Sequence, residues 1–287
     1  MERPGEPMQG LGVFGLSGLV GDAVRAQLRP QDALAWAVTR QPPPGPDALP
    51  WRTSSLPGLA DPPPVQAIAS LGPLDAFTDW FETSARAPER VVALGSTSRH
   101  GKADSPDPGE RELARRLADC ETRLQKACDR RGSALTLLRP TLVWGRGRDR
   151  NLSRWVALAR RWRWVPVPAN ARGLRQPIHA DHVAAAVLAA LRAPAPVAGC
   201  FDLPGGETLA YDQMVQRCLA AAAPGARLLR LPAPLFRWGR ALAGGRGPGA
   251  GVLARLDRDL AYDGGPVRAA LGLAARPFRP GPDDFPA

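Results

Sequence analysis

The sequence predicts an α/β fold, with helices on both faces of a doubly wound parallel sheet and a smaller C-terminal lobe. Glycines at positions 15, 18 and 21 follow an apolar run near the start of the chain. Short apolar runs then alternate with helical patterns, which is typical of parallel sheets. From Cys200 on, short elements separated by glycine and proline replace this alternation. A chain of 287 residues can bury such a core and still form a second lobe.

The elements can be assigned in chain order from the spacing of apolar residues. Continuous apolar runs, as in strands covered on both faces, predict strands in GLGVFG, LAWAVTR (34–40), VQAIASLG (65–72), RVVALGS (90–96) and ALTLLRPTLVWG (134–145). Helices are expected directly after the glycines and at 75–85, 110–132 and 179–193. The helix over 110–132 has the clearest pattern, because apolar residues recur at intervals of three and four and Gly132 ends it.

The net charge of +11 comes almost entirely from arginine. The arginines are spread along the chain rather than gathered in one stripe, so we predict no nucleic-acid partner. The densest patch, RWVALARRWRWVP (154–166), alternates arginine with tryptophan. We interpret it as an amphipathic helix and a following strand that pack through their tryptophans, with a nucleic-acid surface as the alternative.

Composition also bears on the cellular compartment and on metal binding. No apolar stretch reaches the ~20 residues that cross a bilayer, and the N-terminal apolar run lacks a cleavage pattern. We therefore expect a cytoplasmic protein without a membrane partner. The four cysteines and three histidines show no metal-ligand spacing, so no metal site is predicted.

The glycines lie where a strand turns into a helix, in the segment GLSGLVG (15–21). In such a turn one glycine permits the tight bend, one lets a pyrophosphate approach bare backbone, and one lets the helix pack closely. The loop begins a βαβ unit, so we predict a Rossmann-like dinucleotide site rather than a bare structural turn. Its expected cofactor contacts are Gly15, Leu16, Ser17, Gly18, Leu19, Val20 and Gly21.

The end of the second strand bears on which dinucleotide is bound. An acidic residue there would bind the ribose 2′-hydroxyl of NAD, but this chain has Thr39 and Arg40. A guanidinium suits the 2′-phosphate of NADP, so NADP is favoured over NAD. We expect residues 8–145 with 176–195 to form the dinucleotide-binding core, and 146–175 with 200–287 to form the smaller, substrate-binding lobe.

Motifs along nearly the whole chain resemble the extended branch of the short-chain dehydrogenase/reductase superfamily, which includes epimerases and dehydratases of nucleotide sugars, and its atypical relatives. The matching segments are GLSGLVG, RVVALGSTSRHG, LRPTLVWG, RQPIHADHVAAAV and YDGGPVRAALGLAARPFRPG. The resemblance implies that Ser96 takes the place of the catalytic Ser/Thr and that Pro140 lies beside the nicotinamide. It also implies that Arg175 binds a phosphate of a nucleotide diphosphate, and it allows a homodimer.

The family's catalytic tyrosine and lysine, four residues apart on one helix, have no counterpart here. Counting back from Glu121, their positions hold Leu113 and Leu117, and a leucine cannot transfer a proton. The remaining candidates for catalysis are Ser96, His100 and Lys102. Two hypotheses stay open: an NAD(P)-dependent oxidoreductase or epimerase acting on a nucleotide-sugar-like substrate, and a non-catalytic NADP-binding regulatory or sensor protein.

Overall fold

The computed structural model describes residues 10–42, 49–149, 151–232 and 255–286. Its centre is a seven-stranded parallel sheet in the order β11-β6-β5-β4-β1-β2-β3. The strands are β1 (Leu11–Phe14), β2 (Leu34–Thr39), β3 (Trp51–Thr53), β4 (Ala67–Ser70), β5 (Arg90–Leu94), β6 (Ala134–Pro140) and β11 (Gly199–Leu203). The order reverses between β1 and β4, which is the topological switch point of a Rossmann fold. The predicted fold class is confirmed.

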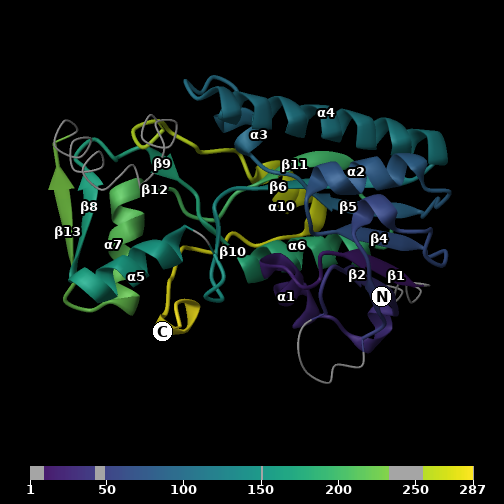
Figure 1. Cartoon of the computed structure of the whole chain (residues 1–287), viewed down its shortest axis with the longest axis horizontal. Helices are drawn as coiled ribbons and strands as arrows, with labels where there is room; N and C mark the ends of the chain where they lie inside the picture. Colours follow the sequence, from purple (N-terminus) through teal and green to yellow (C-terminus); the bar gives the residue numbers. More distant parts are fainter. Residues whose placement is uncertain (1–9, 43–48, 150, 233–254, 287) are drawn as a thin grey trace.

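Helices cover both faces of the sheet (Figure 1). On one face lie α1 (Leu19–Arg25) and α6 (Ala180–Arg192), and on the other lie α2 (Leu74–Thr83) and α4 (Pro108–Arg131). Successive strand residues point to opposite faces. Val13 therefore packs in the apolar cluster beneath α6, whereas Phe14 packs among the aromatic rings of α2 and against Trp36.

The long helix α4 shows how local sequence sets an element's ends. Asp107 caps its N-terminus by accepting hydrogen bonds from the amides of Gly109 (2.8 Å) and Glu110 (3.4 Å), and Pro108 takes the first helical position. Gly132 ends the helix with a φ of +67°. The prediction of a helix over 110–132 is confirmed, with its start two residues earlier.

The smaller lobe surrounds two further apolar clusters at one end of the molecule (Figure 1). It contains α5 (Leu152–Trp162), β8 (Trp164–Pro168), β9 (Leu174–Arg175), β12 (Leu209–Ala210), α7 (Tyr211–Ala222) and β13 (Arg227–Leu231). Between lobe and sheet, β7 (Val143–Trp144) pairs with β10 (Ile178–His179). The shorter elements are α3 (Ser98–Gly101), α10 (Gly265–Leu271) and 3₁₀ turns at Pro30–Asp32, Leu56–Gly58 and Pro282–Asp284.

The structure corrects several element predictions. The strand expected over 134–145 breaks after Pro140, because the chain leaves the sheet there and pairs with β10 instead. Residues 200–203, assigned to the smaller lobe, belong to the seventh strand of the sheet. Trp162 and Trp164 are 48% and 43% exposed, so the prediction that the tryptophans pack inward is wrong for these two. No helix among the described residues is long and apolar enough to span a bilayer.

Candidate functional site

The glycine loop lies at the carboxyl end of β1, beside the switch point. Gly15 has a φ of +81°, and a Cβ added there would lie 2.8 Å from the amide nitrogen of Gly72 after β4. A Cβ on Gly21 would lie 2.2 Å from the carbonyl oxygen of Gly15. These two positions therefore need glycine for the turn and for close packing of α1 on the loop. A Cβ on Gly18 would meet a single atom within 4 Å, the carbonyl oxygen of Gly15 at 3.3 Å, so Gly18 is the least enclosed of the three.

Backbone amides are presented at the start of α1. The first helical hydrogen bond runs from the amide of Asp22 to the carbonyl of Gly18, at 2.8 Å. The amides of Leu19, Val20 and Gly21 precede it and have no partner within the helix. The Leu19 and Val20 side chains pack against the core, and Leu16 is fully buried in it. A contact from Leu16 could therefore come only through its main-chain atoms, whereas Leu19 and Val20 are only partly buried.

The end of β2 meets the glycine loop. The hydroxyl oxygens of Ser17 and Thr39 lie 2.8 Å apart, and Thr39 also donates to the carbonyl of Gln41 at 2.9 Å. Arg40 follows directly and is exposed. The structure therefore brings together the two predicted halves of the dinucleotide site, the loop and the residues that would read the ribose.

A second loop, at 145–149, also reaches the glycine loop, a contact that was not predicted from the sequence. Arg148 donates to the carbonyl of Ser17 at 2.9 Å. Arg146 bridges the first turns of two helices, bonding Asp22 of α1 at 3.0 Å and Asp181 of α6 at 2.6 Å. Although burial opposes its charge, these carboxylates raise the pKa of Arg146. The only local signal was the repeated Gly-Arg after a strand, which does not show where the arginines point.

The ends of β5 and β6 hold the predicted Ser96 and Pro140 close together. Thr97 donates to the carbonyl of Pro140 through both its amide and its hydroxyl, each at 3.3 Å. Ser96 Oγ accepts the amide of Ser98 at 3.1 Å. Since that bond uses an oxygen lone pair, the Ser96 hydroxyl hydrogen can still be donated to a substrate oxygen.

The next turn, α3, carries His100 beside two residues from distant parts of the chain. His100 Nε2 lies 3.3 Å from Asp202 of β11, and its ring centroid lies 5.8 Å from that of Tyr262. The Tyr262 hydroxyl donates to the carbonyl of Thr97 at 3.4 Å. Burial, with the charge of Asp202, raises the pKa of the Tyr262 phenol. An imidazole oriented by a carboxylate is a common arrangement for proton transfer. Asp202 and Tyr262 were missed because only tertiary folding brings them to α3.

Lys102 occupies a different environment from His100. Its ammonium lies 3.7 Å from Glu110 at the start of α4, and Glu110 also pairs with Arg255. Burial and the neighbouring Arg255 lower the pKa of Lys102. These contacts direct Lys102 toward α4, and none of the contacts found joins it to Ser96.

The helix face that bears the catalytic pair in the resembling family is apolar here. Leu113 and Leu117 are half-buried, and Leu117 packs against the core cluster beneath α4. One turn further on, Glu121 is 3% exposed and accepts hydrogen bonds from Arg139 of β6 at 2.7 and 3.0 Å, and it also pairs with Arg99. Although burial opposes its charge, Glu121 raises the pKa of Arg139. This helix therefore contributes a buried ion network at the sheet's carboxyl edge.

Arg175 lies in the smaller lobe and is 7% exposed. Its guanidinium donates to the carbonyls of Leu174 at 2.7 Å and Arg258 at 2.8 Å, and to that of Arg255. Burial lowers its pKa, and the Tyr211 ring lies 5.5 Å from its guanidinium carbon. The contacts found for Arg175 hold the chain that returns from the lobe, and its role toward a phosphate stays a prediction. Among the described residues, no cluster of His, Cys, Asp and Glu could hold a metal ion.

Solved structures share this architecture over nearly the whole chain. MoeE5 in complex with UDP-glucose and NAD superposes with a TM-score of 0.71 at 18% identity, covering 94% of each chain. The chain has the fold of the extended short-chain dehydrogenase/reductases. Human epimerase family protein SDR39U1 with NADPH shares the fold, with a TM-score of 0.67 at 16% identity over 96% of this chain and 97% of that one.

A third structure with the same fold is a UDP-N-acetylglucosamine 4-epimerase from Bacillus cereus. Its TM-score is 0.60 at 16% identity, over 94% of this chain and 99% of that one. No family model matches the sequence, and no curated protein matches it either. At these identities the similarity establishes the epimerase/dehydratase fold. Cofactor, substrate and activity have to be argued from the residues of this chain.

Proposed function

We propose that this protein binds NADP at the glycine loop and works as an epimerase/dehydratase-like NAD(P)-binding protein. The proposal rests on the different surroundings of the three glycines of the loop. A Cβ on Gly15 or Gly21 would overlap several backbone atoms, whereas a Cβ on Gly18 would meet only the Gly15 carbonyl oxygen, at 3.3 Å, and Gly18 lies next to three amides without helical partners. A pyrophosphate is the group that such a bare, amide-lined turn accommodates.

The preference for NADP rests on the residues at the end of β2. Arg40 is exposed beside Thr39, and the described part of this turn holds no carboxylate to bind a ribose hydroxyl. Arg148, which contacts Ser17 of the same loop, adds a second guanidinium. Two guanidinium groups favour the dianionic 2′-phosphate over a neutral hydroxyl. Proteins with this fold have been solved with NAD and with NADPH, so the fold does not decide the preference.

For catalysis we propose a nucleotide-sugar-like substrate with a carbonyl or alcohol at the reacting carbon. MoeE5 has been solved with UDP-glucose bound, in the same fold. A bound nicotinamide would supply the hydride chemistry. In this chain Ser96 would donate its hydroxyl hydrogen to the substrate oxygen, and His100, oriented by Asp202, would accept or return the proton. Lys102 is the weaker candidate, because it pairs with Glu110.

The second candidate function is a non-catalytic NADP sensor. It is favoured by Leu113 and Leu117, which leave the usual catalytic face of α4 apolar. A sensor needs only the dinucleotide site and a lobe that responds to it. Both functions require binding at the glycine loop, and they differ in whether Ser96 and His100 carry out chemistry.

Thermal unfolding and absorbance at the reduced-nicotinamide band distinguish these functions. Both functions predict that NADP raises the melting temperature more than NAD does. The enzyme predicts turnover of a nucleotide sugar, seen as a net change in that absorbance for an oxidoreductase and as a new sugar product, with no net change, for an epimerase; Ser96→Ala and His100→Gln should each reduce it at least about tenfold. Ser98→Ala is the matched control and should leave turnover unchanged. Stabilisation without turnover across nucleotide sugars would leave the sensor, and no stabilisation by either dinucleotide would refute both.

A further inference from the structure

The large hydrophobic side chains that are exposed among the described residues gather at one place. They are Trp162 at 48%, Leu229 at 44% and Trp164 at 43% exposure. Trp162 ends α5, Trp164 begins β8, and Leu229 lies on β13, so all three belong to the outer end of the smaller lobe (Figure 1). The two indole rings lie 5.8 Å apart at an interplanar angle of 31°. Such clustering marks an interaction surface, whereas scattered exposed residues would need no explanation.

The pairing of β8 with β13 explains why this face is uncovered. These two strands form a parallel sheet of their own, with Trp164 in register with Arg227 and Pro166 in register with Leu229. The alternate residues Val165 and Val167 point inward and are buried under α5 and α7. Parallel sheets are normally covered on both faces. Among the described residues, α5 and α7 cover the inner face and none is found to cover the outer one.

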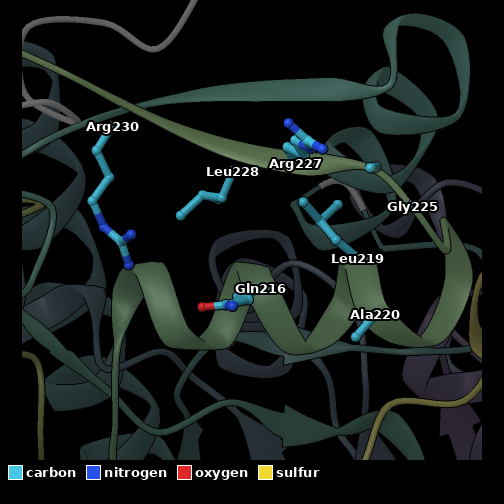
Figure 2. A pocket seen from close by; sticks show the side chains of 8 residues that line it. Gln216, Leu219, Ala220, Gly225, Arg227, Leu228 and Arg230 are labelled. Atoms are coloured by element: carbon cyan, nitrogen blue, oxygen red, sulfur yellow. The ribbon is translucent and has the colours of Figure 1, made fainter.

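A groove runs beside the same sheet, between β13 and α7 (Figure 2). Its volume is about 460 Å³, and its lining combines Leu219 and Leu228 with Gln216, Arg227 and Arg230. Arg230 is held by Asp212 at 2.7 Å, whereas Arg227 is exposed at the end of the groove nearest Trp164. Apolar walls with a cationic end suit a ligand that has an anionic head and an apolar body.

Acidic residues are absent from the two stretches of sequence that contain Trp162, Trp164 and Leu229. Residues 150–180 hold seven arginines and no acidic residue, and residues 213–256 likewise hold seven arginines and no acidic residue. The rest of the chain carries 24 of the 38 basic residues and all 27 acidic ones, so its net charge is −3. Basic residues therefore occur along the whole chain, but the net positive charge comes from these two stretches. Arg161, Arg163 and Arg227 are all exposed around the tryptophans.

We propose that this tryptophan face, comprising Trp162, Trp164 and Leu229 with Arg161 and Arg227, docks the protein on an anionic membrane surface. Tryptophan is enriched where a protein meets the headgroup layer, and arginines next to it attract anionic lipids. Leu229 and the apolar groove would contact acyl chains. Such peripheral binding needs no spanning segment, and it differs from the expectation of no membrane partner that the sequence suggested.

Two other occupants fit the observations less well. A second copy of the chain would bring two arginine-rich faces together, and like charges across an interface repel. A single-stranded nucleic acid would stack its bases on aromatic rings. Here the two indoles are tilted by 31° and lie against each other, and the third exposed side chain is the aliphatic Leu229, which offers no ring for stacking.

Vesicle co-sedimentation of the full chain tests the proposal. The protein should sediment with vesicles that contain about one third phosphatidylglycerol and should stay in solution with neutral phosphatidylcholine vesicles. Arg161→Gln/Arg227→Gln should weaken binding about 30-fold, as expected if each arginine contributes about 1 kcal/mol. The control Arg115→Gln/Arg116→Gln removes the same charge from two exposed positions on α4 and should change binding less than about twofold.

The apolar part of the surface is tested separately. Trp162→Ala/Trp164→Ala should weaken binding at least about tenfold, and brominated acyl chains should quench the fluorescence of the natural protein more than that of this variant. Leu229→Ser is the check if the tryptophan variant unfolds, and it should weaken binding in the same direction. The proposal would be overturned if Arg161→Gln/Arg227→Gln and Arg115→Gln/Arg116→Gln sedimented equally with the vesicles. It would also be overturned if the protein bound single-stranded DNA and did not bind vesicles.

Discussion

The contrast between Gly18 and Gly21 gives a prediction that separates binding from folding. Gly18 is the N-cap of α1, with φ −77° and ψ 177°, a conformation that any residue adopts. Serine is at least as good an N-cap as glycine, and a Cβ there would meet only the Gly15 carbonyl, at 3.3 Å. Gly18→Ser should therefore change the free energy of unfolding by less than about 0.5 kcal/mol. If a pyrophosphate rests against Gly18, the added side chain should lower NADP affinity by about 10–100-fold.

Gly21→Ala is the matched comparison, because its Cβ would stand 2.2 Å from a backbone oxygen and 2.5 Å from the Leu16 carbonyl carbon. Relieving that overlap requires α1 to move by roughly 1 Å, and overpacking of this kind costs about 1–3 kcal/mol. The melting temperature should then fall by about 3–10 °C. Isothermal titration calorimetry with NADP measures the affinity of each variant, and a thermal melt measures its stability. If Gly18→Ser binds NADP as tightly as the natural protein, the pyrophosphate does not lie at this glycine.

Three further predictions follow from charged groups. Arg40→Ala should weaken NADP about tenfold or more and NAD less than about twofold, because only NADP offers a 2′-phosphate, and equal losses in titration would refute the preference. Glu121→Gln leaves Arg139 buried beside an uncharged partner, so the free energy of unfolding measured with denaturant should fall by about 3–5 kcal/mol. An unchanged denaturation midpoint would contradict this. Although burial opposes its ionisation, hydrogen bonds from Arg192 and the amide of Arg29 lower the pKa of Asp32. The contribution of ionised Asp32 to the free energy of unfolding should be complete above about pH 4 and should shrink as the pH falls through the lowered folded pKa. In thermal melts, the difference in stability between the natural protein and Asp32→Asn should therefore become smaller in acid. A difference that stays constant with pH would contradict this.

Periodicity was enough to predict five of the seven strands of the sheet and the four helices that cover it, whereas β11 was wrongly assigned to the smaller lobe. Buried parallel strands need continuous apolar runs, and long amphipathic helices need a stripe at intervals of three and four, so both leave strong local patterns. The strand β3 and the turn α3 were missed because three or four residues carry too little pattern. The break after Pro140 was missed because the apolar run continues through it, while the backbone pairing changes from the sheet to β10.

The candidate site divides in the same way between local and long-range signals. The glycine loop and the Thr39–Arg40 end of β2 are readable because backbone conformation and residue type act within a few positions. Arg148 reaches Ser17 across 131 positions, and Asp202 reaches His100 across 102, with no pattern linking them in the sequence. Side-chain partners of that kind depend on how the strands are ordered.

Local sequence was sufficient to predict a parallel sheet, the glycine-lined turn after its first strand, and leucines at positions 113 and 117 on one face of α4. Each of these is written in neighbouring residues, where spacing and steric freedom act directly. That Lys102 pairs with Glu110 and that Trp162 and Trp164 are exposed became evident only from the folded chain. The physical reason is that burial and charge pairing depend on which distant segments cover a residue, and the pattern of a single helix or strand does not contain that information.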